Sequence, residues 1–130
     1  MNEVLVAVDD DVDRAVAQAE AILDLPWASD QLHVVILHVF GENPEGASVH
    51  QLGSVRRARE RLEEAGVEVT LNESSDGPSE EILDLARELD VDLISVSGRK
   101  RSPAGKALLG SVSQEVLLGA DRPVLFTKTD

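Results

Sequence analysis

The sequence predicts an α/β fold in which a parallel sheet of five strands carries helices on both faces. Short apolar runs alternate with segments whose apolar residues recur at helical spacing, so the predicted order is β-α-β-α-β-α-β-α-β. Only 2% of the residues are aromatic although 42% are hydrophobic, so the core must be built from Val, Leu, Ile and Ala. A chain of 130 residues is long enough for one such core and too short for two. We therefore expect residues 1–130 to form a single domain.

The first third of the chain is predicted to form a strand, a helix and a second strand. Residues 3–8 are an almost continuously apolar run, which is typical of a strand covered on both faces. From Val12 the apolar residues follow one helical stripe, until Pro26 ends the helix. Residues 32–39 are β-branched and apolar and predict the second strand, and the polar, glycine-bearing residues 41–53 predict a loop.

The middle of the chain adds a helix and a third strand. The helix is predicted over residues 54–65, and Gly66 stands where a left-handed cap is needed. Residues 67–71 predict the strand, and the polar residues 72–77 predict a loop. Pro78 then opens the next helix at its first turn, where the missing N–H is not needed.

The last part of the chain predicts a fourth strand over residues 92–96, a helix from Ser111 to Leu118 that stops at Gly119, and a fifth strand over residues 123–127. Parallel strands joined in this order imply a right-handed, doubly wound, Rossmann-like sheet. Ligands of such sheets bind beyond the carboxyl ends of the strands, at the point where the strand order reverses. If the first and fourth strands are neighbours, Asp9 and the loop over residues 97–113 face the same crevice.

The charge of the chain limits its partners. Twenty-five acidic residues stand against twelve basic ones, and the net charge of -13 argues against binding to nucleic acid or to an anionic membrane. The acid excess with few lysines resembles proteins from a high-salt cytoplasm, and we expect a halophilic archaeal source. The chain has no cysteine, no basic and apolar leader at its start, and no apolar run of the roughly 20 residues that a membrane span needs. We expect a soluble, cytoplasmic protein.

One basic segment, residues 96–113, stands out in this acidic chain. It holds four of the twelve basic residues and no acid, and it leads directly into the helix that begins at Ser111. Gly110 and Ser111 would present backbone N–H groups at the start of that helix, which is a site for an anion such as phosphate. A structural alternative is a capping box, in which Ser111 and Gln114 satisfy the end of the helix reciprocally. Both interpretations can hold at once.

Several other chemistries are excluded by their patterns. A Walker A loop would need a glycine at Lys100 and Ser or Thr at Ala107. A phospho-acceptor receiver domain would need an aspartate after the third strand, where Leu71 and Asn72 stand. His33 and His38 lie on opposite faces of one strand and show no metal-ligand spacing. The carboxylates Asp9, Asp10, Asp11 and Asp13 after the first strand are explained by capping the following helix. We predict no catalytic residue and no metal site.

Four segments of the chain resemble the universal stress protein family: VLVAVD, LHV, GPSEEILDLARELDVDLISVSG and GSVSQEVLLGADRPVLFTK. Together they cover nearly the whole length. The resemblance implies the family's five-stranded parallel α/β fold, similar to adenine nucleotide alpha hydrolases, with strand order 3-2-1-4-5. It also implies a stress-response protein that binds an adenine nucleotide, ATP, together with Mg²⁺, and that hydrolyses ATP slowly at most.

The resemblance also implies which residues bind the nucleotide. Asp9 would meet the ribose, Val39 and Phe40 would flank the adenine, and residues 111–113 would hold phosphate. The full implied set is Ala7, Val8, Asp9, Val39, Phe40, Val96, Ser97, Gly98, Arg99, Lys100, Gly110, Ser111, Val112 and Ser113. Two loop glycines of the ATP-binding members are replaced here, by Ser97 and Lys100. The alternative is therefore a family member that binds no nucleotide and acts as a protein-interaction module.

The resemblance implies a homodimer as well. Its contact would be the last strand, through Val124, Leu125, Phe126 and Thr127. An apolar strand at the edge of a sheet is itself a physical reason to expect such pairing.

Overall fold

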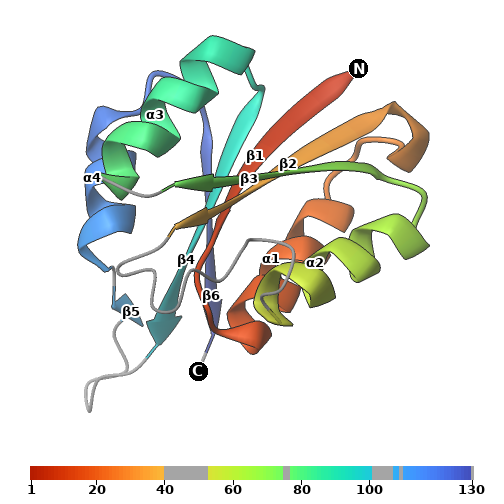
Figure 1. The fold of residues 1–130 in the computed structure, drawn as a ribbon, viewed down its shortest axis with the longest axis horizontal. Helices are drawn as coiled ribbons and strands as arrows, with labels where there is room; N and C mark the ends of the chain where they lie inside the picture. The colour runs from red at the N-terminus through yellow and green to blue at the C-terminus, as the bar shows by residue number, and fades with distance from the viewer. Residues whose placement is uncertain (40–52, 75–76, 101–106, 109, 130) are drawn as a thin grey trace.

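The computed structural model describes residues 1–39, 53–74, 77–100, 107–108 and 110–129. Within these residues the chain folds into one sheet with helices on both of its faces (Figure 1). In chain order the elements are β1 (Asn2–Val8), α1 (Val12–Leu23), a 3-10 turn (Ser29–Gln31), β2 (Leu32–Val39), α2 (Gly53–Glu64), β3 (Glu68–Ser74), α3 (Pro78–Leu89), β4 (Leu93–Lys100), β5 (Ala107–Leu108), α4 (Ser111–Gly119) and β6 (Val124–Thr129).

The sheet confirms the predicted fold class and strand order. Its parallel strands lie in the order β3, β2, β1, β4, β6, which corresponds to 3-2-1-4-5 when the parallel strands are numbered along the chain. The first and fourth parallel strands are therefore neighbours, and the strand order reverses between them. This reversal fixes where a ligand crevice opens.

The core has two halves, one on each face of the sheet. Side chains at alternating positions of a strand point to opposite faces, so Val4, Val6 and Val8 pack on the α1 and α2 side while Leu5 and Ala7 pack on the α3 and α4 side. Helices α1 and α2 pair on one face, and α3 and α4 pair on the other (Figure 1). Aliphatic residues fill both halves, as the composition predicts.

Three strands, β3, β4 and β6, run further than the sequence predicts, and one strand was not predicted. β6 ends at Thr129 instead of residue 127. β4 continues through Lys100 into the segment expected to be a loop, because Gly98 pairs with Lys128 of β6 and Arg99 pairs with Leu108 of β5. β3 continues through Ser74 beside β2 for the same reason. The short antiparallel β5 has only two residues and leaves no periodic signal.

Two glycines have clear structural roles. Gly66 adopts a φ of +88°, so the predicted left-handed cap after α2 is confirmed. Gly119 is different, because it is the last residue of α4 and no left-handed stop. A Cβ added there would lie 2.8 Å from Cδ1 of Leu83, so this glycine allows α4 to pack closely on α3.

Candidate functional site

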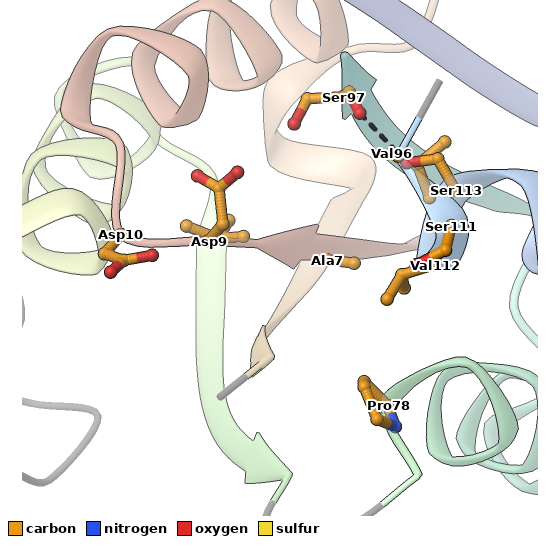
Figure 2. Close-up of a pocket in the computed structure, with 11 residues that line it drawn as sticks. Ala7, Asp9, Asp10, Pro78, Val96, Ser97, Ser111, Val112 and Ser113 are labelled. Atoms are coloured by element: carbon orange, nitrogen blue, oxygen red, sulfur yellow. Dashed lines mark hydrogen bonds between the residues drawn. The ribbon is translucent and has the colours of Figure 1, made fainter. Parts of the chain in front are cut away.

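A pocket of about 350 Å³ opens at the carboxyl edge of the sheet, where β1 and β4 separate. Its volume lies within the range of small-molecule sites. Figure 2 shows that the end of β1, the middle of β4 and the start of α4 surround it, with Pro78 of α3 at one side. The lining residues are Ala7, Val8, Asp9, Asp10, Pro78, Val96, Ser97, Gly110, Ser111, Val112 and Ser113.

Asp9 is held in place by a network at the start of α1. Its Oδ2 accepts a hydrogen bond from Nε of Arg14 at 2.9 Å and lies 2.8 Å from Nη2 of the same residue. Its Oδ1 accepts a hydrogen bond from the backbone N–H of Asp11 at 2.9 Å. The Asp9 side chain nevertheless keeps 37% of its surface exposed, so it can still accept a hydrogen bond from a ligand hydroxyl.

The N-terminus of α1 is closed by its own carboxylates. Asp11 is the N-cap residue, and its Oδ1 accepts a hydrogen bond from the backbone N–H of Arg14 at 2.9 Å. The predicted capping role of these aspartates is thereby confirmed for Asp11. The positive end of α1 is already neutralised and is a poor place for a further anion.

The N-termini of α3 and α4 are not closed in this way. Each begins after a glycine, Gly77 or Gly110, and neither N-cap residue supplies a side-chain hydrogen bond. The predicted capping box is wrong, because Gly110 takes the N-cap position and Ser111 is already the first helical residue. The first main-chain bond of α4 is made by the N–H of Gln114 to the carbonyl of Gly110, at 3.0 Å.

The free amides of α4 therefore belong to its first turn. In a helix the first residues have no main-chain partner for their N–H groups. In α4 these are residues 111–113, all of which line the pocket. Their N–H groups and the positive end of the helix favour an anion at this wall.

His38 lies buried near the same edge of the sheet, at the end of β2. Burial lowers the pKa of its imidazole below the ordinary value of 6.5, and the nearby carboxylates of Asp10, Asp9 and Glu73 act in the opposite direction. His33 lies on the other face of β2, as the five-residue spacing of the two histidines predicts. There its Nε2 is 2.7 Å from Oγ1 of Thr70. Neither histidine lines the pocket.

The pocket brings together most of the residues that the family resemblance implies. Nine of them line it: Ala7, Val8, Asp9, Val96, Ser97, Gly110, Ser111, Val112 and Ser113. Gly98 is buried within β4 and does not line the pocket, and the backbones of Arg99 and Lys100 pair with β5. Val39 is the last residue of β2, and Phe40 lies outside the described residues.

Two lining residues were missed in the sequence. Asp10 was assigned only to helix capping, and Pro78 only to the start of a helix. A signal for Pro78 was available, because a helix that begins at the carboxyl edge of the same sheet faces the same crevice. In the described part of the chain no group of three or more His, Asp or Glu residues is arranged to hold a metal ion. No helix among those residues is long and apolar enough to cross a membrane.

Comparison with known proteins identifies the family. Residues 1–128 match the sequence model of the universal stress protein family. A universal stress protein of Mycolicibacterium smegmatis is 32% identical over 96 residues, which are 73% of this chain and 74% of that relative. This chain belongs to the universal stress protein family.

Solved structures of universal stress proteins share the fold. One from Archaeoglobus fulgidus is 28% identical with a TM-score of 0.72, and the match covers 98% of this chain and 99% of that one. A universal stress protein in complex with cAMP is 24% identical with a TM-score of 0.74, covering 99% and 98%. A universal stress protein from Archaeoglobus fulgidus in complex with dAMP is 24% identical with a TM-score of 0.61, covering 98% of each chain.

Proposed function

We propose that this universal stress protein binds an adenine nucleotide in the pocket between β1 and α4. The observation that carries the proposal is the contrast between the helix N-termini at this edge. The N-terminus of α1 is closed by Asp11, whereas those of α3 and α4 begin on glycines without a side-chain cap. Related structures that hold cAMP and dAMP support the choice of an adenine nucleotide.

The phosphates of the nucleotide would bind at the start of α4. Residues 111–113 offer backbone N–H groups, and the Ser111 hydroxyl is exposed beside them. Asp9, which is held by Arg14 on the other side of the pocket, would accept a hydrogen bond from the ribose. The apolar side chains of Ala7, Val96 and Val112 leave room between these polar ends for uncharged parts of the ligand.

We assign ATP with Mg²⁺ as the ligand to be tested first. Mg²⁺ keeps much of its water and is usually bound by one or two carboxylates together with substrate phosphates. The exposed carboxylate of Asp10 lines the pocket and is of the right chemistry for such a role. When bound, the ion would supply charge neutralisation of the phosphates. We propose binding without fast turnover, as a cytoplasmic stress-response protein.

We also propose that the protein acts as a homodimer. We further propose that its source is a halophilic archaeon. β6 pairs with β4 alone among the described strands, so its other edge is available for a second copy. The net charge of -13 with only three lysines, Lys100, Lys106 and Lys128, fits a protein that works in concentrated salt. A free energy of unfolding that failed to rise with molar KCl would count against the halophilic source.

The nucleotide site is tested by filling it at Gly110. A Cβ added at this residue meets nothing within 4 Å, and its φ of -67° is open to any residue. Gly110→Val should therefore fold normally and obstruct the pocket that Gly110 lines. Calorimetric titration with ATP and Mg²⁺ in high KCl should show binding by the natural protein and an affinity at least about tenfold weaker in the variant.

Gln114→Val is the matched control, because Gln114 is exposed on α4 and does not line the pocket. It introduces the same β-branched side chain into the same helix and should keep the affinity. Equal weakening in both variants would mean that the loss comes from the helix and not from the pocket. Absence of binding by the natural protein would refute the nucleotide assignment.

A protein-interaction module of the same fold is the second candidate. The observation that favours it is a pair of adjacent leucines on the outer side of α4, Leu117 and Leu118, of which Leu118 is 81% exposed. Single exposed apolar residues are common, whereas adjacent ones at a helix end suit a partner surface. This candidate becomes the preferred one if the titration shows no nucleotide binding.

A further inference from the structure

β4 has three zones along its length, and the pocket lies at the middle one. Its first residues pair with β1, in a register that ends at Val6 and Ser95. Its last residues, Arg99 and Lys100, pair with β5. Between these zones, the edge of residues 96–98 that faces β1 is unpaired in the described part of the chain. The crevice therefore exists because the ladder between β1 and β4 stops after Ser95.

The ladder stops although its next groups point toward each other. Peptide groups of alternate residues face the same neighbouring strand. The Glu3 carbonyl accepts a hydrogen bond from the N–H of Asp92 at 2.8 Å, so the carbonyl of Ala7 also faces β4. Asp92 precedes β4 and lies outside its alternation. Within β4 the N–H of Ile94 donates to Pro123 on the opposite side, so the peptide groups of Ser95 and Ser97 face β1. The next bond of the ladder would join the Ser97 amide to the Ala7 carbonyl.

Side chains satisfy these carbonyls instead. Nε2 of Gln18 donates to the Ala7 carbonyl at 3.0 Å and to Oγ of Ser95 at 3.3 Å. Gln18 projects from α1 and is completely buried. Oγ of Ser113 donates to the Ser97 carbonyl at 2.9 Å, a contact drawn as a dashed line in Figure 2. On each strand, a side-chain donor thus replaces the other strand: Gln18 bonds to the Ala7 carbonyl, and Ser113 bonds to the Ser97 carbonyl.

We propose that Gln18 is a positioning residue that holds the ligand crevice open by replacing the next backbone bond between β1 and β4. A buried carbonyl without a hydrogen-bond donor is unfavourable. Loss of the Gln18 amide therefore favours a hydrogen bond from the Ser97 N–H to the Ala7 carbonyl. That bond closes the crevice between two residues that line it. The consequence for ligand binding rests on the proposed nucleotide function, whereas the consequence for strand pairing does not.

The first test replaces Gln18 by methionine, which has a similar shape and no donor. In the ligand-free protein, amide hydrogen exchange at Ser97 measured by NMR should become at least about tenfold slower, because a new hydrogen bond protects it. Nucleotide affinity should fall by about tenfold or more, because only the remaining open fraction binds. Unchanged exchange at Ser97 would overturn the proposal.

A stability control separates positioning from general damage. Ile22→Val removes one methylene one turn further along the same buried face of α1. It should lower the melting temperature while keeping both Ser97 exchange and nucleotide affinity. If Ile22→Val weakens binding as much as Gln18→Met does, the effect is loss of stability and the proposal fails.

Gln18→Glu provides the rescue and covers the case in which Gln18→Met does not fold. Burial favours the neutral carboxyl group, whose O–H can donate to the Ala7 carbonyl. Affinity close to that of the natural protein is expected at low pH, with a loss on raising the pH that the natural protein does not show. A flat pH profile would contradict the proposal. If the natural protein binds no nucleotide, the proposed function fails, and Ser97 exchange still decides the role of Gln18.

Discussion

At the scale of single residues, one edge of the sheet holds a carboxylate that is fixed by hydrogen bonds and a buried histidine whose pKa is lowered. Arg14 and the Asp11 amide fix Asp9 before any ligand arrives, which lowers the entropy lost on binding. His38 lies in a buried position whose environment lowers its pKa. The end of the sheet thus combines the partly exposed charge of Asp9 with the buried imidazole of His38.

His38 makes stability depend on pH in a definite direction. Its pKa is lower in the folded protein than the value of 6.5 expected in the unfolded chain, so the unfolded chain takes up the proton first as the pH falls. The stability that comes from the neutral form is complete above pH 6.5 and is lost as the pH falls through the lowered pKa. In urea titrations between pH 8 and pH 5, His38→Gln should show a shallower pH dependence, by at most about 1.4 kcal/mol per pH unit.

Val34→Ala is the control for this prediction. Val34 is fully buried on the same face of β2 and carries no titratable group. The variant should be less stable at every pH while keeping the slope of the natural protein. A slope in His38→Gln equal to that of Val34→Ala would show that His38 contributes nothing to the pH dependence.

At the scale of elements, the edge strand β6 is the surface on which a second copy would pair. The Pro123 carbonyl accepts from Ile94, so odd-numbered residues around β6 face β4, and the amide of the exposed Lys128 faces the free edge. Lys128→Pro removes that outward donor without removing a bond to β4. Light scattering coupled to gel filtration should show a dimer for the natural protein and dissociation that is at least about tenfold easier in this variant.

Lys128→Ala removes the same charge and keeps the N–H, so it should remain dimeric. Dissociation of Lys128→Ala would assign the effect to charge instead of strand pairing. A monomeric natural protein at all concentrations would contradict the proposed dimer.

The ends of the elements also show where sequence patterns lose information. The end of β4, residues 97–100, is polar and contains a glycine, so it reads as a loop by composition. It forms a strand because β6 and β5 supply partners on its two sides, and strand formation depends on such context. The capping box failed for a different reason, since Gly110 and not Ser111 takes the N-cap position and Ser111 is already helical.

At the scale of the whole molecule, the sheet order and the location of the pocket followed from the sequence. Alternating strand and helix patterns predict a parallel sheet, and the family resemblance implies its order. The reversal between β1 and β4 then places Asp9 and the start of α4 at one crevice. The opening of that crevice was not predictable in detail, because it depends on which strands stop pairing. The signal was a single polar residue, Gln18, within the apolar stripe of α1.

The central claim is that one pocket holds a nucleotide between Asp9 and the first turn of α4. The most direct measurement is an NMR titration of the ¹⁵N-labelled protein with ATP and Mg²⁺ in high KCl. The account predicts saturable shifts of the Ser111, Val112 and Ser113 amides together with that of Asp9, at ligand concentrations up to about 1 mM. Absence of shifts at these four amides, or saturable shifts confined to another face of the sheet, would contradict it.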